Sequence, residues 1–246
     1  MKLRSCFFIL LLLAGTMPSL AQLKMTFPSK DEVTITADWY PVNSESMTIL
    51  LCHQNGFSRG EYRETAAKLN KFGFNCLAID QRVGAEVNGV VNETAKDARE
   101  KRKAQNFINA EQDIEAAVDW LFNKYDRRVI VLGSSYSASL ALKVAKENEH
   151  VFAVIAFSPG EYFEQKDFIA KHINGLKKPV FLTSSKEEAA GVTELTKDVL
   201  SLIKVQFIPR GDGDHGSKVL WSSRPENQDY WAAMMSFLNR MKKENE

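Results

Sequence analysis

The sequence predicts an α/β protein built around a mostly parallel sheet, and three observations support that prediction. Short apolar runs of strand length recur along the chain, helical segments alternate with them, and several runs are apolar at every position. Thr48–Cys52 and Val129–Leu132 are continuous runs of this last kind. A strand that helices cover on both faces has this composition, whereas a half-exposed strand alternates. The alternation of strands and helices favours right-handed crossovers between parallel strands.

The first 21 residues are expected to be a secretory signal peptide. Lys2 and Arg4 give a positive start, Phe7–Ala14 is apolar, and Ser19–Ala21 places small residues at two positions of a cleavage site. The apolar run is shorter than the roughly 20 residues that cross a bilayer. Cleavage after Ala21 leaves residues 22–246 as one domain in the periplasm or outside the cell. An uncleaved membrane anchor is the alternative.

Composition excludes several classes of partner. The 32 Lys and Arg residues balance 31 Asp and Glu residues, and removal of the signal peptide leaves the balance close to zero. Without a polybasic field, neither nucleic acid nor, after cleavage, a membrane surface is expected as a partner. Cys52 and Cys76 lie in apolar strand-like runs, so they are expected to be buried free thiols. No metal-ligand spacing is present.

The strands are expected in chain order, and the first two form an antiparallel hairpin. Leu23–Phe27 and Val33–Tyr40 flank the turn segment Pro28–Glu32. The runs that follow form the mostly parallel part of the sheet: Met47–Cys52, Asn75–Ile79, Arg128–Leu132, Phe152–Phe157, Val180–Thr183 and Val205–Ile208.

Helices are predicted where apolar residues recur at helical spacing, on both faces of the sheet. They cover Glu61–Phe72, Gln112–Phe122, Tyr136–Lys146 and Asn227–Met241. In the first, Tyr62, Ala66, Leu69 and Phe72 share one face. The polar stretch Val83–Gln105 is unusually long for a connection. A solvated helix face is favoured there over a loop that roofs a site at the carboxyl ends of the strands.

The segment Val129–Leu140 carries the strongest functional signal. A buried strand runs directly into an Ala-rich helix through a turn of small residues. The turn resembles the nucleophile elbow of the α/β-hydrolase family, Gly-x-Ser-x-Gly, which holds its serine in a strained conformation. The resemblance makes Ser135 the nucleophile, with Gly133 before it and Ser137 in place of the second glycine. Ser134 fits less well, because a leucine would then fill the crowded position two residues earlier.

A serine hydroxyl needs a base near neutral pH, and His215 is expected to be that base. It lies in the Gly-rich segment Arg210–Gly216, between the last strand and the last helix, where the resemblance places the general base. His53 ends the third strand and is expected to shape a nearby loop. His150 and His172 lie among charged residues and are expected at the surface.

The third member of the triad should orient the imidazole and stabilise the imidazolium. In the family it follows the strand before the histidine loop, in the pattern Pro, five-residue strand, Gly, two residues, Asp. Counting from Pro179 places Ser185 at the glycine and Glu188 at the acid. A shifted strand exit selects Glu187 instead, so Glu187 is kept as the alternative.

Two backbone N–H groups should face the oxyanion of the tetrahedral intermediate. The resemblance assigns one to Tyr136, directly after the nucleophile. The other comes from the turn after the third strand, which resembles the family's His-Gly oxyanion turn with Gln54 where glycine is usual. Counting from His53 favours the Asn55 N–H, with Gln54 as the alternate.

These features follow one another in the family's order along the mature chain, and the chain is most similar to the compact dienelactone-hydrolase-like esterases. The connection from Ser158 to Pro179 is short, so no large cap domain is expected. Dienelactone hydrolases use cysteine where this chain has Ser135, which favours a simple carboxylester. The resemblance implies a carboxylesterase that cleaves small-molecule esters through an acyl-enzyme with a Ser-His-Glu triad, without a metal or organic cofactor.

Two other functions stay open. A secreted, non-catalytic binding protein of the same fold is supported by the unusual acid loop and by Gln54. A peptidase or an acyltransferase with the same triad is the nearer alternative. The pocket is expected among loops near Asn55, Tyr136 and Ser158–Tyr162, whose mixed polarity identifies no acyl or alcohol group. No sequence feature predicts an oligomeric state.

Overall fold

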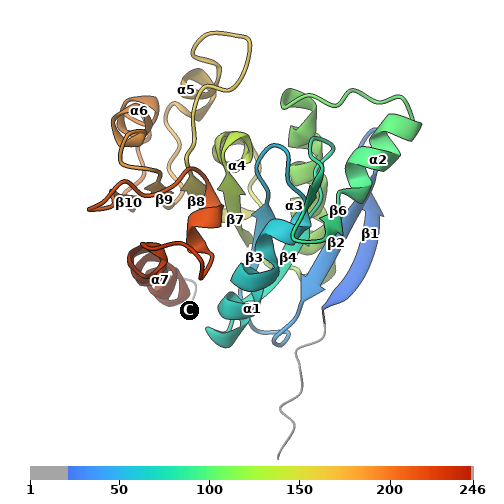
Figure 1. Ribbon diagram of the computed structural model, residues 1–246, viewed down its shortest axis with the longest axis horizontal. Coiled ribbons are helices and arrows are strands. Elements are labelled where there is room, and N and C mark those ends of the chain that lie inside the picture. Colours follow the sequence, from blue (N-terminus) through green and yellow to red (C-terminus); the bar gives the residue numbers. More distant parts are fainter. Residues whose placement is uncertain (1–21, 245–246) are drawn as a thin grey trace, which may run out of the picture.

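An eight-stranded sheet forms the centre of the protein in the computed structural model, which describes residues 22–244 (Figure 1). Its order is β1-β2-β4-β3-β7-β8-β9-β10. The strands are β1 (Leu23–Pro28), β2 (Thr34–Tyr40), β3 (Thr48–Cys52), β4 (Asn75–Ile79), β7 (Val129–Ser134), β8 (Val151–Phe157), β9 (Val180–Thr183) and β10 (Lys204–Phe207). β2 pairs antiparallel with β1 and β4, and all other pairs are parallel. The predicted fold class, with its N-terminal hairpin, is confirmed.

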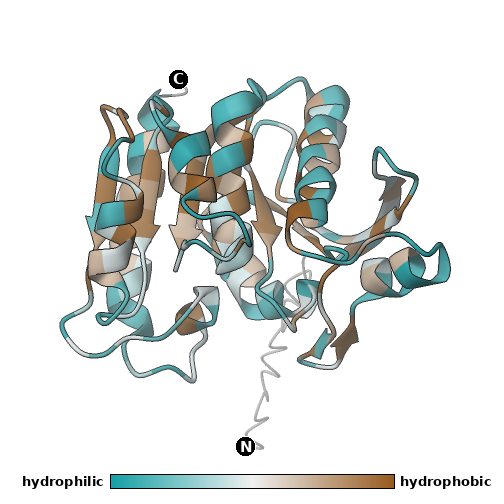
Figure 2. Cartoon of the chain, turned by 90° about the horizontal axis from the view of Figure 1, so that it is seen from above, coloured by the Kyte–Doolittle hydropathy of each residue, from teal (hydrophilic) through white to brown (hydrophobic). Residues whose placement is uncertain are grey.

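Helices cover both faces of this sheet. The long ones are α1 (Arg63–Lys71), α3 (Glu111–Tyr125), α4 (Tyr136–Glu147) and α7 (Asn227–Glu244). Buried side chains of α1 and α7 join one core cluster, and those of α3 and α4 join the other, together with α5 (Phe168–Ile173) and α6 (Ala189–Leu195). The strands are mostly hydrophobic, whereas the helices carry hydrophilic outer faces (Figure 2). The segment between β8 and β9 contains α5 alone.

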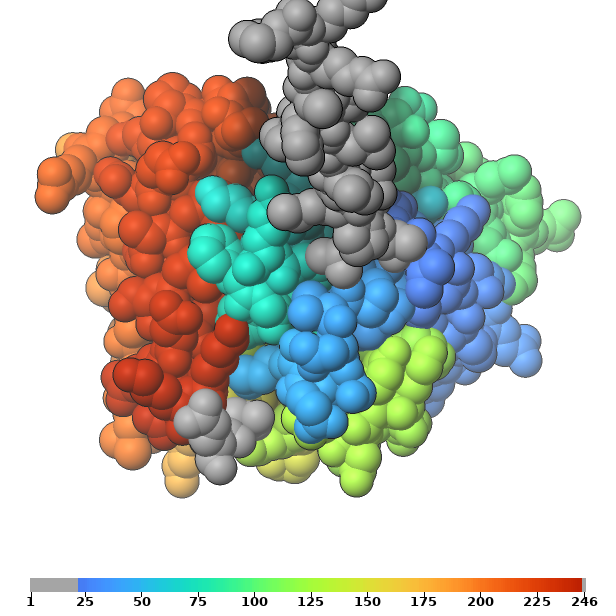
Figure 3. Space-filling view, turned by 90° about the horizontal axis from the view of Figure 1, so that it is seen from below, coloured from blue at the N-terminus to red at the C-terminus, as the bar shows by residue number. Residues whose placement is uncertain are grey.

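The first predicted helix differs from the structure at both ends. Residues 59–62 form a 3-10 turn, and α1 begins only at Arg63. Tyr62 is buried as expected, but Phe72 is 42% exposed. Phe72 lies beyond the end of α1, and its ring meets Trp231 of α7 at the rim of the core, with 6.3 Å between centroids. Phe72, which was expected to share one helix face with Tyr62, therefore lies outside the helix and at the rim of the core. α1 and α7 lie side by side on this face (Figure 3).

The polar stretch 83–105 folds into regular elements. A short hairpin of β5 (Glu86–Val87) and β6 (Val90–Val91) leads into α2 (Glu93–Glu100). The Asn92 side chain caps α2 by accepting a hydrogen bond from the Ala95 N–H (2.7 Å). Thr94 accepts one from the Thr36 N–H of β2 (2.9 Å), so α2 rests on the sheet edge. Its outer side is exposed, which agrees with the favoured helix interpretation; the hairpin was not predicted.

A fully buried arginine, Arg82, joins three segments at the same edge. Its guanidinium donates to Asp31, in the turn between β1 and β2, at 2.8 and 2.9 Å. It also donates to Asp113, near the start of α3, at 2.7 Å. Asp113 is itself fully buried, so its charge depends on this one guanidinium.

Replacing Arg82 with methionine should lower the free energy of unfolding by about 3–5 kcal/mol, because it leaves Asp113 charged and unpaired in the core. Urea denaturation at pH 7 measures the change. Arg127→Met is the matched control, since Arg127 pairs with Glu45 at the surface and should contribute less than about 1 kcal/mol. Equal losses in the two variants would refute the structural role of Arg82.

The two cysteines of the described region are buried free thiols, as predicted. Cys52 lies beside Ile79 and Cys76 beside Ile49 in the parallel pair of β3 and β4. The two side chains thus sit at different levels of the sheet. Burial raises the pKa of both thiols, which keeps them protonated near neutral pH.

The expected signal peptide, residues 1–21, lies outside the described residues. Within residues 22–244, no helix is both long enough and apolar enough to span a bilayer.

Candidate active site

β7 runs into α4 through a turn that holds Ser135 at φ +60° and ψ −125°. A positive φ is strained for serine, and the surroundings enforce it. The Ser135 N–H donates to the Phe157 carbonyl of β8 (2.8 Å). Strand and helix approach so closely that a Cβ on Gly133 would lie 2.5 Å from the Ser137 carbonyl oxygen. Only glycine fits at position 133, as the elbow motif requires.

Ser137 stands where the motif has its second glycine, and its hydroxyl makes hydrogen bonds that a glycine could not make. The hydroxyl donates to the Cys52 carbonyl at the end of β3 (2.7 Å). It also accepts from the Ser134 N–H (2.9 Å). The side chain therefore fastens the elbow to the strand that leads into the expected oxyanion turn.

His215 lies between Ser135 and Glu188, and each comes from a different loop. Its Nε2 is 2.9 Å from the Ser135 Oγ, and its Nδ1 bonds to the Glu188 Oε1. Ser135 follows β7, Glu188 follows β9 and His215 follows β10, so parallel strands in one half of the sheet deliver all three to the same edge. The alternative acid, Glu187, is exposed and makes no hydrogen bond to His215.

The second oxygen of Glu188 is held by two donors. Glu188 Oε2 accepts from the Ser158 hydroxyl (2.7 Å) and from the Ser185 N–H (3.1 Å). Burial raises the pKa of Glu188, but the hydrogen bonds from His215 and Ser158 outweigh it and bring the pKa to about 2. The group is therefore a carboxylate at any pH near neutral.

Ser158 also accepts from the Gly216 N–H (3.0 Å) and so ties the acid loop to the histidine loop. Sequence reasoning had placed Ser158 only in a pocket loop. No motif marks its role, and its position directly after β8 is the one available signal.

The turn after β3 presents two N–H groups that differ in their partners. The Gln54 N–H donates to the Glu61 Oε2 (2.9 Å). Among the described residues, the Asn55 N–H and the Tyr136 N–H have no acceptor. The Tyr136 N–H also opens α4, where the helix dipole favours negative charge. These two donors are the ones free to receive an oxyanion.

His53 fixes this turn from inside the protein. Its Nε2 lies 2.9 Å from the Gln81 N–H, which can only donate, so the ring proton sits on Nδ1 and points to the Gln54 carbonyl (2.8 Å). Burial lowers the pKa of His53 to about 4, which keeps the ring neutral. This agrees with the expected loop-shaping role. His150 and His172 are half-buried on other elements and touch none of these residues.

Glu61 is a buried carboxyl that sequence reasoning did not single out. Its Oε1 accepts from the Ser217 hydroxyl (2.6 Å), two residues after His215, and its Oε2 accepts from the Gln54 N–H. It thus connects the histidine loop to the turn after β3. Burial raises the pKa of Glu61 to about 7, although the hydrogen bonds from Ser217 and Gln54 oppose the shift.

The raised pKa of Glu61 predicts a pH-dependent stability. Between its ordinary value of 4.5 and about 7, the folded state binds more protons than the unfolded state, so stability falls as pH rises through this window. In Glu61→Gln the amide stays neutral, accepts from the Gln54 N–H and donates to Ser217. Relative to this variant, the wild type should lose about 3 kcal/mol of unfolding free energy between pH 4.5 and 7. Urea titrations across that range measure the difference; parallel pH profiles would contradict it.

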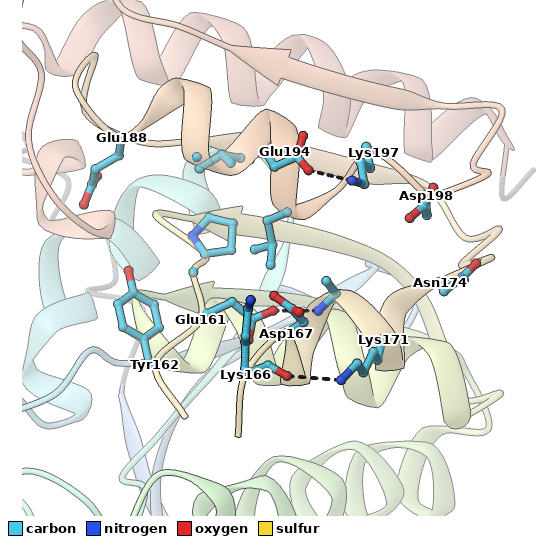
Figure 4. Close-up of a pocket in the computed structure, with 16 residues that line it drawn as sticks. Glu161, Tyr162, Lys166, Asp167, Lys171, Asn174, Glu188, Glu194, Lys197 and Asp198 are labelled. Atoms are coloured by element: carbon cyan, nitrogen blue, oxygen red, sulfur yellow. Dashed lines mark hydrogen bonds and ion pairs between the residues drawn. The ribbon is translucent and has the colours of Figure 1, made fainter. Parts of the chain in front are cut away.

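A hollow of ≈ 790 Å³ opens between α5 and α6 (Figure 4). Glu188 and Tyr162 stand at one end of it, and Asn174 and Asp198 at the other. Half of the residues that line it are charged, and apolar groups lie between them. The hollow reaches the neighbourhood of His215 through Glu188, which bonds its Nδ1, and through Tyr162, whose ring meets the imidazole edge-on. Within residues 22–244, no group of three or more His, Cys, Asp or Glu side chains is arranged to hold a metal ion.

Comparisons with known proteins agree with this geometry. A family profile described as "Serine aminopeptidase, S33" matches residues 43–202. The Pyrococcus furiosus esterase Pf2001 shares 20% identity and a TM-score of 0.67 over 90% of each chain. Dienelactone hydrolase from Anabaena variabilis shares 19% identity and a TM-score of 0.65 over 88% of this chain and 95% of that one.

Acylaminoacyl peptidase from Pyrococcus horikoshii is also similar, with 15% identity and a TM-score of 0.64. The match covers 89% of this chain but 41% of the peptidase. A comparison with curated protein sequences finds no match. At these identities the solved structures establish the shared fold.

Proposed function

Because the chain belongs to the serine aminopeptidase S33 family of α/β hydrolases, we propose that it is a serine carboxylesterase acting on small-molecule esters. The observation that carries the proposal is the hydrogen-bonded series from Glu188 through His215 to Ser135. A carboxylate, an imidazole and a strained serine in this order form an acyl-transfer triad.

In the first half of the reaction, His215 Nε2 takes the hydroxyl proton as Ser135 Oγ attacks the ester carbonyl carbon. The carbonyl electron pair moves to oxygen, and the N–H groups of Asn55 and Tyr136 stabilise the oxyanion. Glu188 stabilises the imidazolium. When the intermediate collapses, the carbon–oxygen bond to the alcohol breaks and His215 returns the proton to the leaving oxygen. An acyl-enzyme on Ser135 remains.

The second half repeats these steps with water. His215 takes a proton from the water as it attacks the acyl carbon, and the same two N–H groups bind the oxyanion. The bond to Ser135 Oγ then breaks and Oγ recovers its proton from His215, which releases the acid. Every proton transfer uses the same imidazole nitrogen, Nε2 of His215, so these reaction steps need no metal or organic cofactor.

Ester cleavage has more support than peptide cleavage. The esterase neighbour is similar over 90% of both chains, whereas this chain covers 41% of the peptidase neighbour. Because the family description names an aminopeptidase, amide hydrolysis is the second candidate function. An ester also demands less of the site, because an alkoxide is a better leaving group than an amide anion, so the nitrogen of an amide must be protonated before it can leave.

Three compounds test the proposal on purified residues 22–246: p-nitrophenyl acetate, alanine p-nitroanilide and phenylmethylsulfonyl fluoride. We expect rapid release of nitrophenol, at least about 100-fold slower anilide cleavage, and stoichiometric inactivation by the sulfonyl fluoride. Comparable rates on the anilide would favour a peptidase. No turnover and no sulfonylation would favour the non-catalytic binding protein.

We also propose that the protein is exported by residues 1–21 and acts in the periplasm or outside the cell, without a nucleic-acid or membrane partner. The balanced charge and the N-terminal composition support this. N-terminal sequencing of the exported protein should begin at Gln22; an N-terminus at Met1 would contradict cleavage.

A further inference from the structure

A second hollow, of ≈ 330 Å³, lies between residues 106–108 and 162–168. We call it the aromatic hollow, because aromatic residues form half of its lining. The lining consists of Asn106, Phe107, Ile108, Tyr162, Phe163, Glu164, Gln165 and Phe168. Its volume is in the range of small-ligand pockets, and polar groups are confined to a few positions.

Two walls of the aromatic hollow contact residues that flank Ser135. The Phe107 ring stacks on Tyr136, the residue after Ser135, with 4.4 Å between centroids. The Tyr162 ring meets the His215 ring edge-on at 6.5 Å. Burial raises the pKa of the Tyr162 phenol, which keeps it neutral beside the His215 ring.

The walls hold one another in place. Phe163 meets Phe107 edge-on at 6.5 Å and Phe168 at 5.0 Å. The Tyr162 hydroxyl donates to the Ser158 carbonyl (2.8 Å), so the tyrosine is anchored beside the triad. The hollow is therefore preformed, and a ligand entering it pays little to order the side chains.

The chemistry of the lining selects the occupant. Aromatic rings pack well against other rings in stacked or edge-to-face geometry, and these contacts add to the hydrophobic gain. Glu164 at the edge disfavours a negatively charged group. Half of the residues that line the larger hollow between α5 and α6 are charged, whereas Glu164 is the one charged residue in the lining of the aromatic hollow, so an uncharged ring is better accommodated in the aromatic hollow.

We propose that the aromatic hollow binds an uncharged aryl ring of the substrate, so that the preferred substrates are aryl-alkyl esters. This inference rests on the proposed esterase activity and names the substrate class of that site. The ring is carried by either the acyl or the alcohol part, and separate substrate pairs distinguish the two.

The test compares kcat/KM within two pairs of esters, by titration of the released acid: ethyl phenylacetate against ethyl hexanoate, and benzyl acetate against hexyl acetate. In at least one pair the ring-bearing ester should be preferred by about tenfold or more, and Phe163→Ala should reduce that ratio about tenfold. Phe122→Ala should keep the wild-type ratio. Phe122 is also half-buried and stacks on one ring, that of His150, but it lies on α3 away from the hollow.

A ratio near one in both pairs, or an equal change in the two Phe variants, would overturn the inference. Binding of benzyl alcohol and hexanol, followed by NMR line broadening, separates this failure from failure of the esterase proposal. Suppose that no ester is hydrolysed, that benzyl alcohol binds more tightly than hexanol, and that Phe163→Ala removes this difference. The ring site is then supported and the esterase proposal is refuted. If benzyl alcohol shows no such preference, the ring site itself is refuted.

Discussion

Replacing Ser135 with alanine should lower kcat for p-nitrophenyl acetate by about 10⁴-fold or more. The Ser135 hydroxyl is the group that lies 2.9 Å from His215 Nε2, and the turn at φ +60° holds it there. Alanine keeps the turn but removes the hydroxyl that this imidazole deprotonates in the first step. A purified variant with the wild-type melting temperature isolates the chemical effect.

Ser134→Ala is the matched control, because the two serines are adjacent and both are buried. The Ser134 hydroxyl accepts from the Ser217 N–H (2.8 Å) and makes no hydrogen bond to His215. Its loss should cost less than about tenfold in kcat, through small shifts of the histidine loop. If Ser134→Ala abolished turnover and Ser135→Ala did not, the assignment of the nucleophile would be reversed.

The fold was predictable because its signals are local. Continuous apolar runs indicate strands buried on both faces, and those strands are present. The short elements were harder to predict. The β5–β6 hairpin and α2 lie in a polar segment, and what fixes them is contact with distant residues such as Thr36 and Gln81. The pattern of apolar residues along the segment gives no indication of these contacts, so the hairpin could not be predicted from it.

The site shows the same division. Counting along motifs singled out Ser135, His215 and Glu188, and the structure brings these three together. Glu61 carries no local mark, since its partner Ser217 is 156 positions away in the chain. A buried carboxyl between two loops becomes visible only when the loops are in place.

At positions 54, 137 and 185 this chain has a polar residue where the family pattern has glycine, and the polar side chain has a structural role at each. The Ser137 hydroxyl binds the Cys52 carbonyl, and the Ser185 hydroxyl accepts from the Glu188 N–H (3.3 Å). The Gln54 side chain occupies the space beside Gly216, where a Cβ would lie 2.2 Å from its Oε1. The Ser137 side chain links the elbow to the end of β3, the Ser185 side chain stabilises its own loop, and Gly216 provides the room that Gln54 requires.

Replacing Glu188 with glutamine should lower kcat by about 10⁴-fold through the imidazole tautomer. The Ser185 N–H can only donate, so the amide oxygen of the new side chain takes the place of Oε2, next to Ser158 and Ser185. The amide NH₂ then faces His215 Nδ1. That nitrogen must accept, the ring proton moves to Nε2, and His215 can no longer take the Ser135 proton.

Glu187→Gln supplies the comparison, because Glu187 is the adjacent residue, is exposed and makes the same change of charge. Its kcat should stay within about twofold of wild type, since surface charge substitutions have small effects. A general loss of negative charge near His215 would reduce both variants alike, whereas a tautomer effect requires the hydrogen bond that Glu188 alone makes. A large loss in Glu187→Gln with an active Glu188→Gln would move the acid to position 187 and require the exit from β9 to shift by one residue.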